Sequence, residues 1–184
     1  MNGKIVLEVK YENLDQYDEG VDEEMEAKRK IYEPLIGRYL MLFSVLEHIL
    51  DIEIANLINE RGYDQGYIVI KDLEVGEKIE LLYNLSFPLV FHSPKRANQK
   101  MKQLNLFKTK LESVSILRNK IAHAKWYTLD KEGYIRIDTK TNKENGLIKF
   151  RKFRITPSLI QAGIKEINFL VEKLVDYGLD LQSF

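Results

Sequence analysis

Several residue types that define common classes of site are absent or scarce in this chain. It contains no cysteine, so disulfide bonds, thiolate metal ligands and a cysteine nucleophile are excluded. It has three histidines, and no two of them have the spacing of metal ligands. No carboxylate cluster suits a divalent ion, and there is no glycine-rich phosphate-binding loop. We therefore expect neither a metal site nor a bound cofactor.

Long apolar runs are also missing. The most apolar region, residues 35–50, contains Arg38, Glu47 and His48 and does not suit a membrane span. Near the N-terminus the only apolar stretch is residues 5–7, which is too short for a signal peptide. These absences lead us to expect a cytoplasmic protein without membrane contact.

What the chain does contain is an uneven distribution of charge. Its 28 basic and 28 acidic residues cancel over the whole length. Residues 1–27 nevertheless carry nine acidic residues against two lysines, whereas residues 94–154 carry 17 lysines and arginines against five acids. Such a basic block suits a polyanionic partner such as nucleic acid. It is also compatible with solvated surfaces that the acidic N-terminal arm balances.

Helical periodicity dominates the sequence. With 184 residues, 45% of them apolar, the chain can build one domain around a core. Apolar residues recur every three or four positions in four segments, which we expect to form helices at about 26–60, 75–86, 93–124 and 156–178. Pro34 can kink or restart the first segment. This segment carries two apolar stripes, the first of Ile36, Tyr39, Phe43, Leu46, Leu50, Ile54 and Leu57 and the second of Leu35, Leu42, Val45, Ile49 and Ile52. The last segment opens at Thr156-Pro157, which is typical of a helix start.

The period changes after the third helix. Residues 126–129, 134–138 and 147–155 are typical of strands, and residues 4–9 form another short strand candidate. We therefore predict a mainly α protein, a helical bundle of four to five helices with a small β-hairpin at about 126–155, inserted before the last helix. Residues 1–27 are expected to form the first strand and an acidic arm, and residues 28–184 the helical domain.

The end of the third helix carries a group of residues suited to chemistry, Leu117-Arg118-Asn119-Lys120-Ile121-Ala122-His123. On an ideal helix Asn119 and His123 lie side by side opposite the apolar stripe, and Arg118 lies on the flank, about 140° from His123. Arginine can bind a phosphate through two parallel hydrogen bonds, and histidine transfers protons near neutral pH. The group suits phosphodiester chemistry without a metal. Solvated cations are also common at a helix C-terminus, whose dipole they complement.

This string resembles the Arg-x4–6-His signature of the HEPN (higher eukaryotes and prokaryotes nucleotide-binding) superfamily. The polar residue after the arginine and the place at the end of a long helix match as well. The resemblance covers residues 28–177 in layout and about seven residues in motif. It implies two chains that pair their motifs in one cleft, where the RNA 2′-OH attacks the adjacent phosphorus and leaves a 2′,3′-cyclic phosphate.

Carried onto this chain, the resemblance gives His123 the proton transfer, Arg118 the stabilisation of phosphoryl charge and Asn119 the orientation of one phosphoryl oxygen. We expect the RNA backbone to contact basic residues beside the motif and on the last predicted strand, namely Lys120, Lys125, Lys149, Arg151, Lys152 and Arg154.

Three further residues are candidates for support of the site. An acidic residue at a place like that of Glu47 recurs in the superfamily, and His48 is its neighbour; a structural pair is the alternative. In one HEPN toxin group a partner nucleotidyltransferase adenylylates a tyrosine two residues after the histidine. Tyr127 lies four residues after His123, so it departs from that pattern, and packing beside Trp126 is its alternative role.

Two functions remain open from the sequence alone. The first is a ribonuclease of a toxin–antitoxin, abortive-infection or antiviral-defence system, with an antitoxin or nucleotidyltransferase as partner. The second is a non-catalytic HEPN-like domain that binds nucleic acid, nucleotide or a partner protein. The two apolar stripes of the first helix and the need for paired motifs predict a homodimer. The acidic arm is expected either to occupy the RNA path or to aid solubility.

Overall fold

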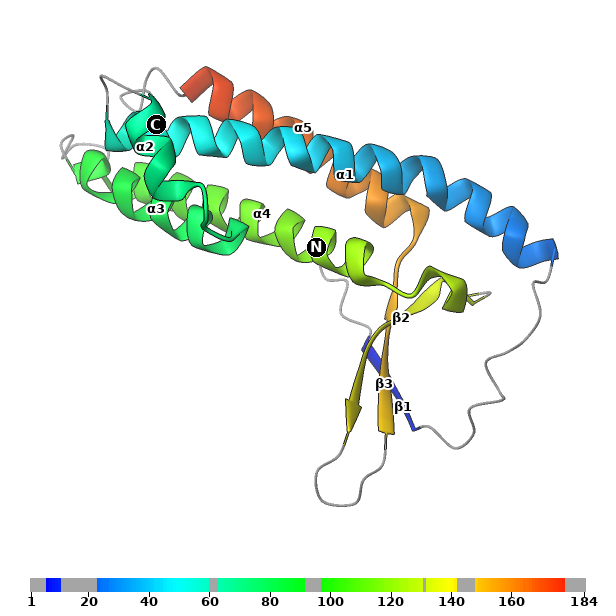
Figure 1. Ribbon diagram of the computed structural model, residues 1–184. Coiled ribbons are helices and arrows are strands. Elements are labelled where there is room, and N and C mark those ends of the chain that lie inside the picture. The colour runs from blue at the N-terminus through cyan, green and yellow to red at the C-terminus, as the bar shows by residue number, and fades with distance from the viewer. Residues whose placement is uncertain are drawn as a thin grey trace. The chain divides into compact units, whose positions relative to one another are not determined.

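The protein is mainly helical, with a small antiparallel sheet whose hairpin precedes the last helix (Figure 1). The computed structural model describes residues 6–10, 23–59, 63–91, 97–130, 132–141 and 148–177. The helices are α1 (Glu23–Ile58), α2 (Tyr63–Ile70), α3 (Val75–Phe91), α4 (Ala97–His123), the short 3-10 turn η3 (Trp126–Thr128) and α5 (Pro157–Tyr177). The strands are β1 (Val6–Lys10), β2 (Tyr134–Thr141) and β3 (Ile148–Arg154).

The chain divides into two compact units. The first consists of residues 1–39 and 119–162, and the second of residues 40–118 and 163–184. The first unit holds the sheet, the start of α1 and the end of α4, while the second holds α2, α3 and most of the long helices. Of the expected acidic arm, residues 11–22 lie outside the described part of the chain, and its last residues belong to α1, which begins at Glu23.

Helix α1 continues through Pro34 without a break. The predicted stripe is buried, from Tyr39 through Phe43, Leu46 and Leu50 to Ile54. Part of the second stripe faces solvent, because Val45 is 47% exposed and its neighbour Met41 is 74% exposed. Two apolar faces on one helix are therefore present, and among the residues that the structure describes only one of them is fully covered.

Helix α2 was missed by the sequence patterns, because its eight residues are too few for a helical period and include Gly66. Glycine is required there by a close approach to α1. A Cβ built on Gly66 would lie 2.5 Å from the carbonyl oxygen of Ala55, far inside van der Waals contact. The next helix, α3, runs to Phe91 and so passes Pro88, where the sequence predicted an end at residues 86–88.

Helices α3, α4 and α5 in the second unit are joined by polar contacts as well as apolar ones. The hydroxyl of Tyr83 on α3 donates to Asn105 Oδ1 on α4 at 2.9 Å. Lys110 on α4 pairs with Glu166 on α5. The stripe predicted on α4, including Leu111, Val114 and Leu117, is buried as expected. The start expected for α4 at Ser93-Pro94 lies outside the described residues.

Helix α5 begins where the sequence predicted. The Thr156 hydroxyl accepts a hydrogen bond from the Leu159 N–H at 3.2 Å, as an N-cap does, and Pro157 occupies the first helical position. Its apolar positions Ile160, Ile164, Ile167, Leu170 and Leu174 are all buried. The end expected at Gly178 lies outside the described residues.

The sheet has the strand order β1-β3-β2 and is antiparallel throughout. The short N-terminal strand was predicted, and it pairs with β3. The strand predicted at residues 126–129 is wrong. Residues 126–128 form η3 with Leu129 as its C-cap, and the backbone of Lys125 makes an isolated bridge to Arg136. The Thr128 N–H and the Thr128 hydroxyl both donate hydrogen bonds to the Lys125 carbonyl, at 2.8 and 2.7 Å, and these bonds close the segment into a turn.

The core of the first unit forms around Tyr32 of α1. Its hydroxyl donates to the Ile155 carbonyl at 2.9 Å, and its ring lies 5.6 Å from that of Trp126. The side chains of Ile135, Phe153 and Ile155 are buried in the same unit. Gly133 has a positive φ of 85°, and a Cβ there would lie 3.1 Å from the Ile155 carbonyl, so this turn needs glycine.

Candidate functional site

The predicted motif lies on one continuous helix. Helix α4 includes Arg118 and Asn119 and ends at His123. Asn119 and His123 are both exposed and lie one turn apart, on the same face of the helix. The border between the two units passes between Arg118 and Asn119. Arg118 therefore belongs to the second unit, whereas Asn119 and His123 belong to the first, where the helix spaces them about 6 Å apart along its axis.

Arg118 is half-buried and has a defined partner. Its guanidinium carbon lies 5.8 Å from the centre of the Phe43 ring, and Phe43 is itself buried in α1. A cation at this distance is attracted by the ring quadrupole.

The two lysines next to the motif differ. Lys120 places its Nζ 3.8 Å from the centre of the buried Phe153 ring, so it covers the core of the first unit. Lys125 is exposed, and its backbone is fixed by an N–H bond of 2.8 Å to the Arg136 carbonyl. Of the two, Lys125 is the better placed to meet a polyanion.

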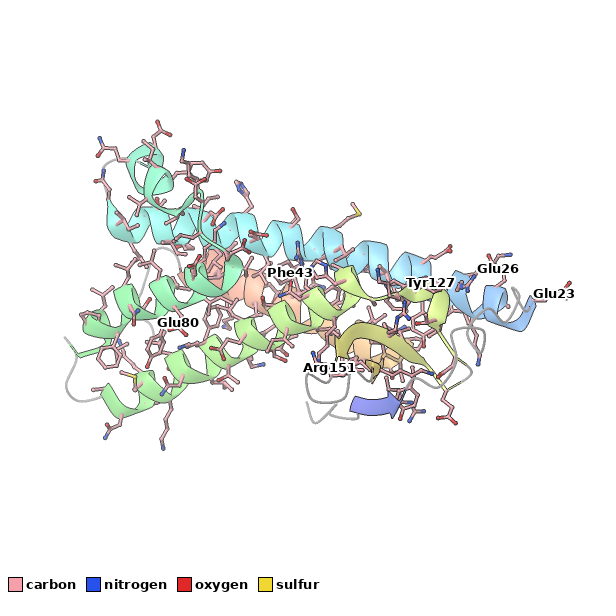
Figure 2. All side chains as sticks on the ribbon, turned by 60° about the horizontal axis from the view of Figure 1, so that its bottom comes forward. Glu23, Glu26, Phe43, Glu80, Tyr127 and Arg151 are labelled. Carbon is pink, nitrogen blue, oxygen red and sulfur yellow. The ribbon has the colours of Figure 1, made fainter. Side chains whose placement is uncertain are left out.

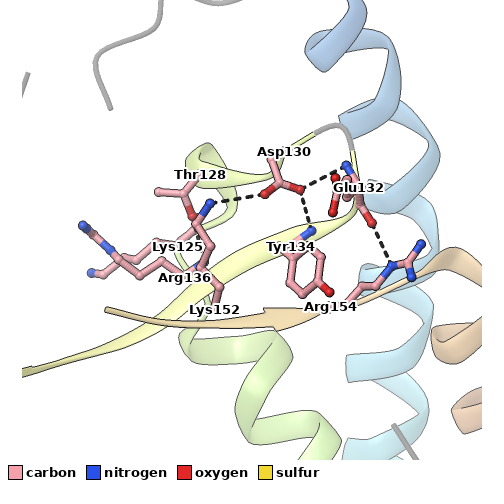
Figure 3. A network of polar contacts seen from close by, with 8 residues as sticks. All are labelled: Lys125, Thr128, Asp130, Glu132, Tyr134, Arg136, Lys152 and Arg154. Atoms are coloured by element: carbon pink, nitrogen blue, oxygen red, sulfur yellow. Dashed lines mark hydrogen bonds and ion pairs between the residues drawn. The ribbon is translucent and has the colours of Figure 1, made fainter. Parts of the chain in front are cut away.

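The basic residues expected on the last strand do not form one track. Lys152 pairs with Asp130 at 3.2 Å, and the Arg154 Nε–H donates to the Glu132 carbonyl at 2.9 Å (Figure 3). Arg151, labelled in Figure 2, lies between two acidic positions in the sheet register, Glu8 on β1 and Asp138 on β2. Side chains alternate across a strand, so Arg151 occupies the face opposite that of Lys152 and Arg154. The side chain of Lys149 lies outside the described part of the structure.

Asp130 organises this network, and the sequence patterns did not single it out. Its carboxylate accepts from the N–H groups of Glu132 and Tyr134 at 3.1 and 2.8 Å, in addition to Lys152 (Figure 3). An aspartate three residues before a glycine is a typical turn signal, so the sequence did contain a clue. Lys152 and Arg154 thus hold the hairpin together.

The residues of η3 point in opposite directions. The indole N–H of Trp126 donates to the Ile121 carbonyl in the last turn of α4 at 2.9 Å, which ties η3 to the motif helix. Tyr127 is 61% exposed, so its interpretation as a packing residue is wrong. The backbone carbonyl of Tyr127 accepts a hydrogen bond from Arg29 Nη2 at 3.2 Å, and the same arginine pairs with Glu26. Tyr127 and Glu26 are both labelled in Figure 2.

Glu47 has a structural partner in the second unit. Lys78 of α3 is almost fully buried and lies 2.8 Å from an Asp51 carboxylate oxygen and 3.4 Å from one of Glu47. Burial lowers the pKa of Lys78, but the hydrogen bonds and charges of Asp51 and Glu47 outweigh it, so the pKa is raised above its ordinary value. His48 is exposed on α1, in the unit that does not contain His123.

The described residues also bear on metal binding and on membrane insertion. Within those ranges, no group of three or more histidine and carboxylate side chains is placed to hold a metal ion. None of the described helices combines the length and apolar character needed to cross a bilayer.

Comparison with known proteins adds no assignment. No family model, curated protein or solved structure matches this chain.

Proposed function

We propose that the chain is a HEPN-like, metal-independent endoribonuclease. The observation that carries the proposal is the pair Asn119 and His123, exposed one turn apart at the end of α4, with Arg118 immediately before them. A proton-transfer group, an amide and a fork-shaped cation on one helix end are the parts that phosphodiester transesterification needs.

The proposed reaction has one covalent step. The ribose 2′-oxygen attacks the adjacent phosphorus, its proton leaves, and the bond from phosphorus to the 5′-oxygen breaks as that oxygen gains a proton. His123 transfers the proton, Arg118 stabilises charge on the phosphoryl oxygens, and Asn119 orients one of them. The products carry 2′,3′-cyclic phosphate and 5′-hydroxyl ends, and DNA is inert because it lacks the 2′-OH.

Each chain supplies one motif and hence one His123. Two copies of the chain are therefore required if one His123 accepts the proton of the 2′-OH and the other donates a proton to the 5′-oxygen. The exposed apolar positions Met41 and Val45 on α1 support pairing of this face in a homodimer. Light scattering at micromolar concentration is expected to give twice the chain mass, and a stable monomer contradicts paired catalysis. In the cell the proposed role is a toxin or antiviral-defence module, restrained by an antitoxin or a nucleotidyltransferase.

The decisive experiment compares the protein with its His123→Ala variant on RNA in EDTA. We expect the variant to lose cleavage by at least about 10²-fold, the usual contribution of proton transfer, while its circular dichroism is unchanged because His123 is exposed. The Asn98→Ala variant, which removes an exposed polar side chain from the first turn of the same helix, serves as the control and should cleave normally. Cleavage that persists in His123→Ala, or that disappears with chelator, rejects the proposed mechanism.

One observation favours a second candidate, a non-catalytic HEPN-like domain that binds nucleic acid, nucleotide or a partner protein. Lys152 and Arg154 make intramolecular contacts, so fewer cations point to an extended RNA path than the sequence suggested. In that case RNA or nucleotide binds with salt-dependent affinity and is recovered intact.

A further inference from the structure

Tyr127 is a rigidly held aromatic ring in solvent. Its peptide is fixed from three directions, by the Arg29 bond to its own carbonyl, by the Trp126 indole bond to α4, and by the Thr128 hydroxyl, which accepts from the Arg136 N–H at 2.9 Å. The ring itself nevertheless stays 61% exposed. An exposed aromatic group on an anchored backbone loses little conformational entropy when a planar ligand stacks on it.

The position of Arg136 leaves the faces of that ring available. Its Nη2 donates to the Tyr127 hydroxyl at 2.6 Å, and its guanidinium carbon lies 5.8 Å from the ring centre. Both distances are satisfied when the guanidinium lies beyond the hydroxyl end of the ring, not flat over it. The bond fixes the rotation of the ring and puts a positive charge at its edge.

The surroundings of the ring suit a nucleotide. Arg136 is at its edge, so a cation that attracts phosphate lies beside a surface that can stack a base, and Lys125 is a second exposed cation two residues earlier in the chain. His123, four residues before Tyr127 in the same unit, is joined to it through the last turn of α4 and η3. Stacking requires a free base face, and bases inside a duplex have none.

We propose that Tyr127 is the stacking platform for an unpaired nucleobase next to the scissile phosphate, so that the substrate class is single-stranded RNA. This inference rests on the proposed ribonuclease function for the scissile phosphate, and on the geometry of Tyr127, Lys125 and Arg136 for the base.

The test measures binding without cleavage. In a His123→Ala background, a fluorescent single-stranded oligoribonucleotide containing 2-aminopurine is titrated with the parent protein and with Tyr127→Leu, Tyr127→Phe and Tyr67→Leu. Tyr67 is an exposed tyrosine on α2 in the other unit and provides the matched control. Thermal unfolding of each variant checks that the fold is intact, which the exposure of Tyr127 predicts.

We expect Tyr127→Leu to weaken binding by about 5- to 150-fold, the contribution of one stacked base, and to abolish the change in 2-aminopurine fluorescence. Tyr127→Phe keeps the ring and should lose less than about threefold, and Tyr67→Leu should bind as the parent does. The same RNA annealed to its complement should bind more weakly to the parent and should be insensitive to Tyr127→Leu.

The outcomes separate this inference from the proposed function. If the unmodified protein does not cleave RNA but single-strand binding depends on the Tyr127 ring, the nuclease is rejected and the platform stands. If it cleaves RNA and Tyr127→Leu binds and cleaves normally, the platform is rejected and the nuclease stands. Equal affinity for single strand and duplex, or no RNA binding at all, also overturns the platform.

Discussion

The indole N–H of Trp126 donates to the carbonyl oxygen of Ile121 at 2.9 Å, and this bond replaces the one that would have continued α4. In an α-helix that carbonyl would accept from the N–H of Lys125, four residues on. The Lys125 N–H instead donates to the Arg136 carbonyl at 2.8 Å, in the hairpin. Helix α4 therefore ends at His123 because its next donor is taken by β2, and Trp126 satisfies the carbonyl left behind.

The first prediction follows from that bond. Trp126→Phe keeps an aromatic ring beside Tyr32 but removes the donor to the Ile121 carbonyl. We expect the free energy of unfolding to fall by about 1 kcal/mol, the usual net contribution of one hydrogen bond, plus a smaller loss of packing area. Urea unfolding of both proteins measures this difference in the free energy of unfolding. Tyr127→Phe also removes a hydrogen bond, the one from Arg136, but at an exposed site where water replaces the lost partner, so it should change stability far less. Equal effects from both variants would contradict this role for Trp126.

The second prediction concerns the approach of α2 to α1. Gly66→Ala places a methyl group 2.5 Å from the Ala55 carbonyl oxygen, so one helix must move. We expect a loss of about 1–3 kcal/mol, as for other overpacked sites. Gly37→Ala is the matched control, because a Cβ at Gly37, in the interior of α1, meets nothing within 4 Å. There alanine should stabilise by about 0.5–1 kcal/mol through helix propensity, so thermal unfolding should shift in opposite directions for the two variants.

The third prediction uses the buried pair of Lys78 and Asp51. Lys78→Met leaves the Asp51 charge buried without its cation, which should cost about 3–5 kcal/mol. The double variant Lys78→Met with Asp51→Leu removes both charges and should recover most of that loss, since apolar replacement of a buried pair is often neutral. Urea unfolding of the two variants at pH 7 measures the difference, and a double variant no more stable than the single one would contradict this account.

The same lysine gives a pH dependence. The pKa of Lys78 is raised in the folded protein above its ordinary value of 10.5. The pair therefore contributes its full stability below about pH 10.5 and loses it as the pH rises through the higher folded pKa. Between pH 9 and pH 11.5 the double variant should lose less stability than the unmodified protein. Parallel losses would show that other groups, such as the buried Tyr32, whose pKa burial also raises, dominate alkaline unfolding.

The fourth prediction addresses Arg118. If its fork binds the phosphoryl oxygens, Arg118→Ala should lower cleavage by about 10²- to 10³-fold, as the loss of a preorganised donor does elsewhere. Arg118→Lys keeps the positive charge but loses the forked guanidinium, so its rate should lie between those of the unmodified protein and Arg118→Ala. Arg38→Ala removes an exposed arginine from α1 and should leave the rate unchanged. Single-turnover kinetics measure all three, and a normal rate in Arg118→Ala would remove this residue from the mechanism.

Local patterns predicted much of the fold, and their failures have physical causes. The stripe through Leu111, Val114 and Leu117 and the cap at Thr156 are local signals, and both were confirmed. Helix α2 was missed because its stability depends on contact with α1 at Gly66, and no short-range pattern reports such a contact.

The candidate site was predictable only where it depends on local spacing along a helix. The positions of Asn119 and His123 follow from helical spacing and were confirmed as exposed. The partners of the strand cations were not visible, because the pairing of Lys152 with Asp130 joins residues 22 apart in the sequence. Nor could the sequence show which of Trp126 and Tyr127 turns inward, because that depends on the bond from the Trp126 indole to the Ile121 carbonyl, which forms in the 3-10 turn.

The strand order of the sheet has a consequence for synthesis on the ribosome. In the register of β1 and β3, Lys10 faces Lys149, 139 positions later in the chain. At typical translation rates of about 5–20 residues per second, β1 is made roughly 7–28 seconds before its partner. Throughout that interval the strand has no native edge to join, and the central strand of the sheet is the last of the three to be made. Completion of the sheet is therefore a late event in biogenesis, and until then the first unit lacks its central strand.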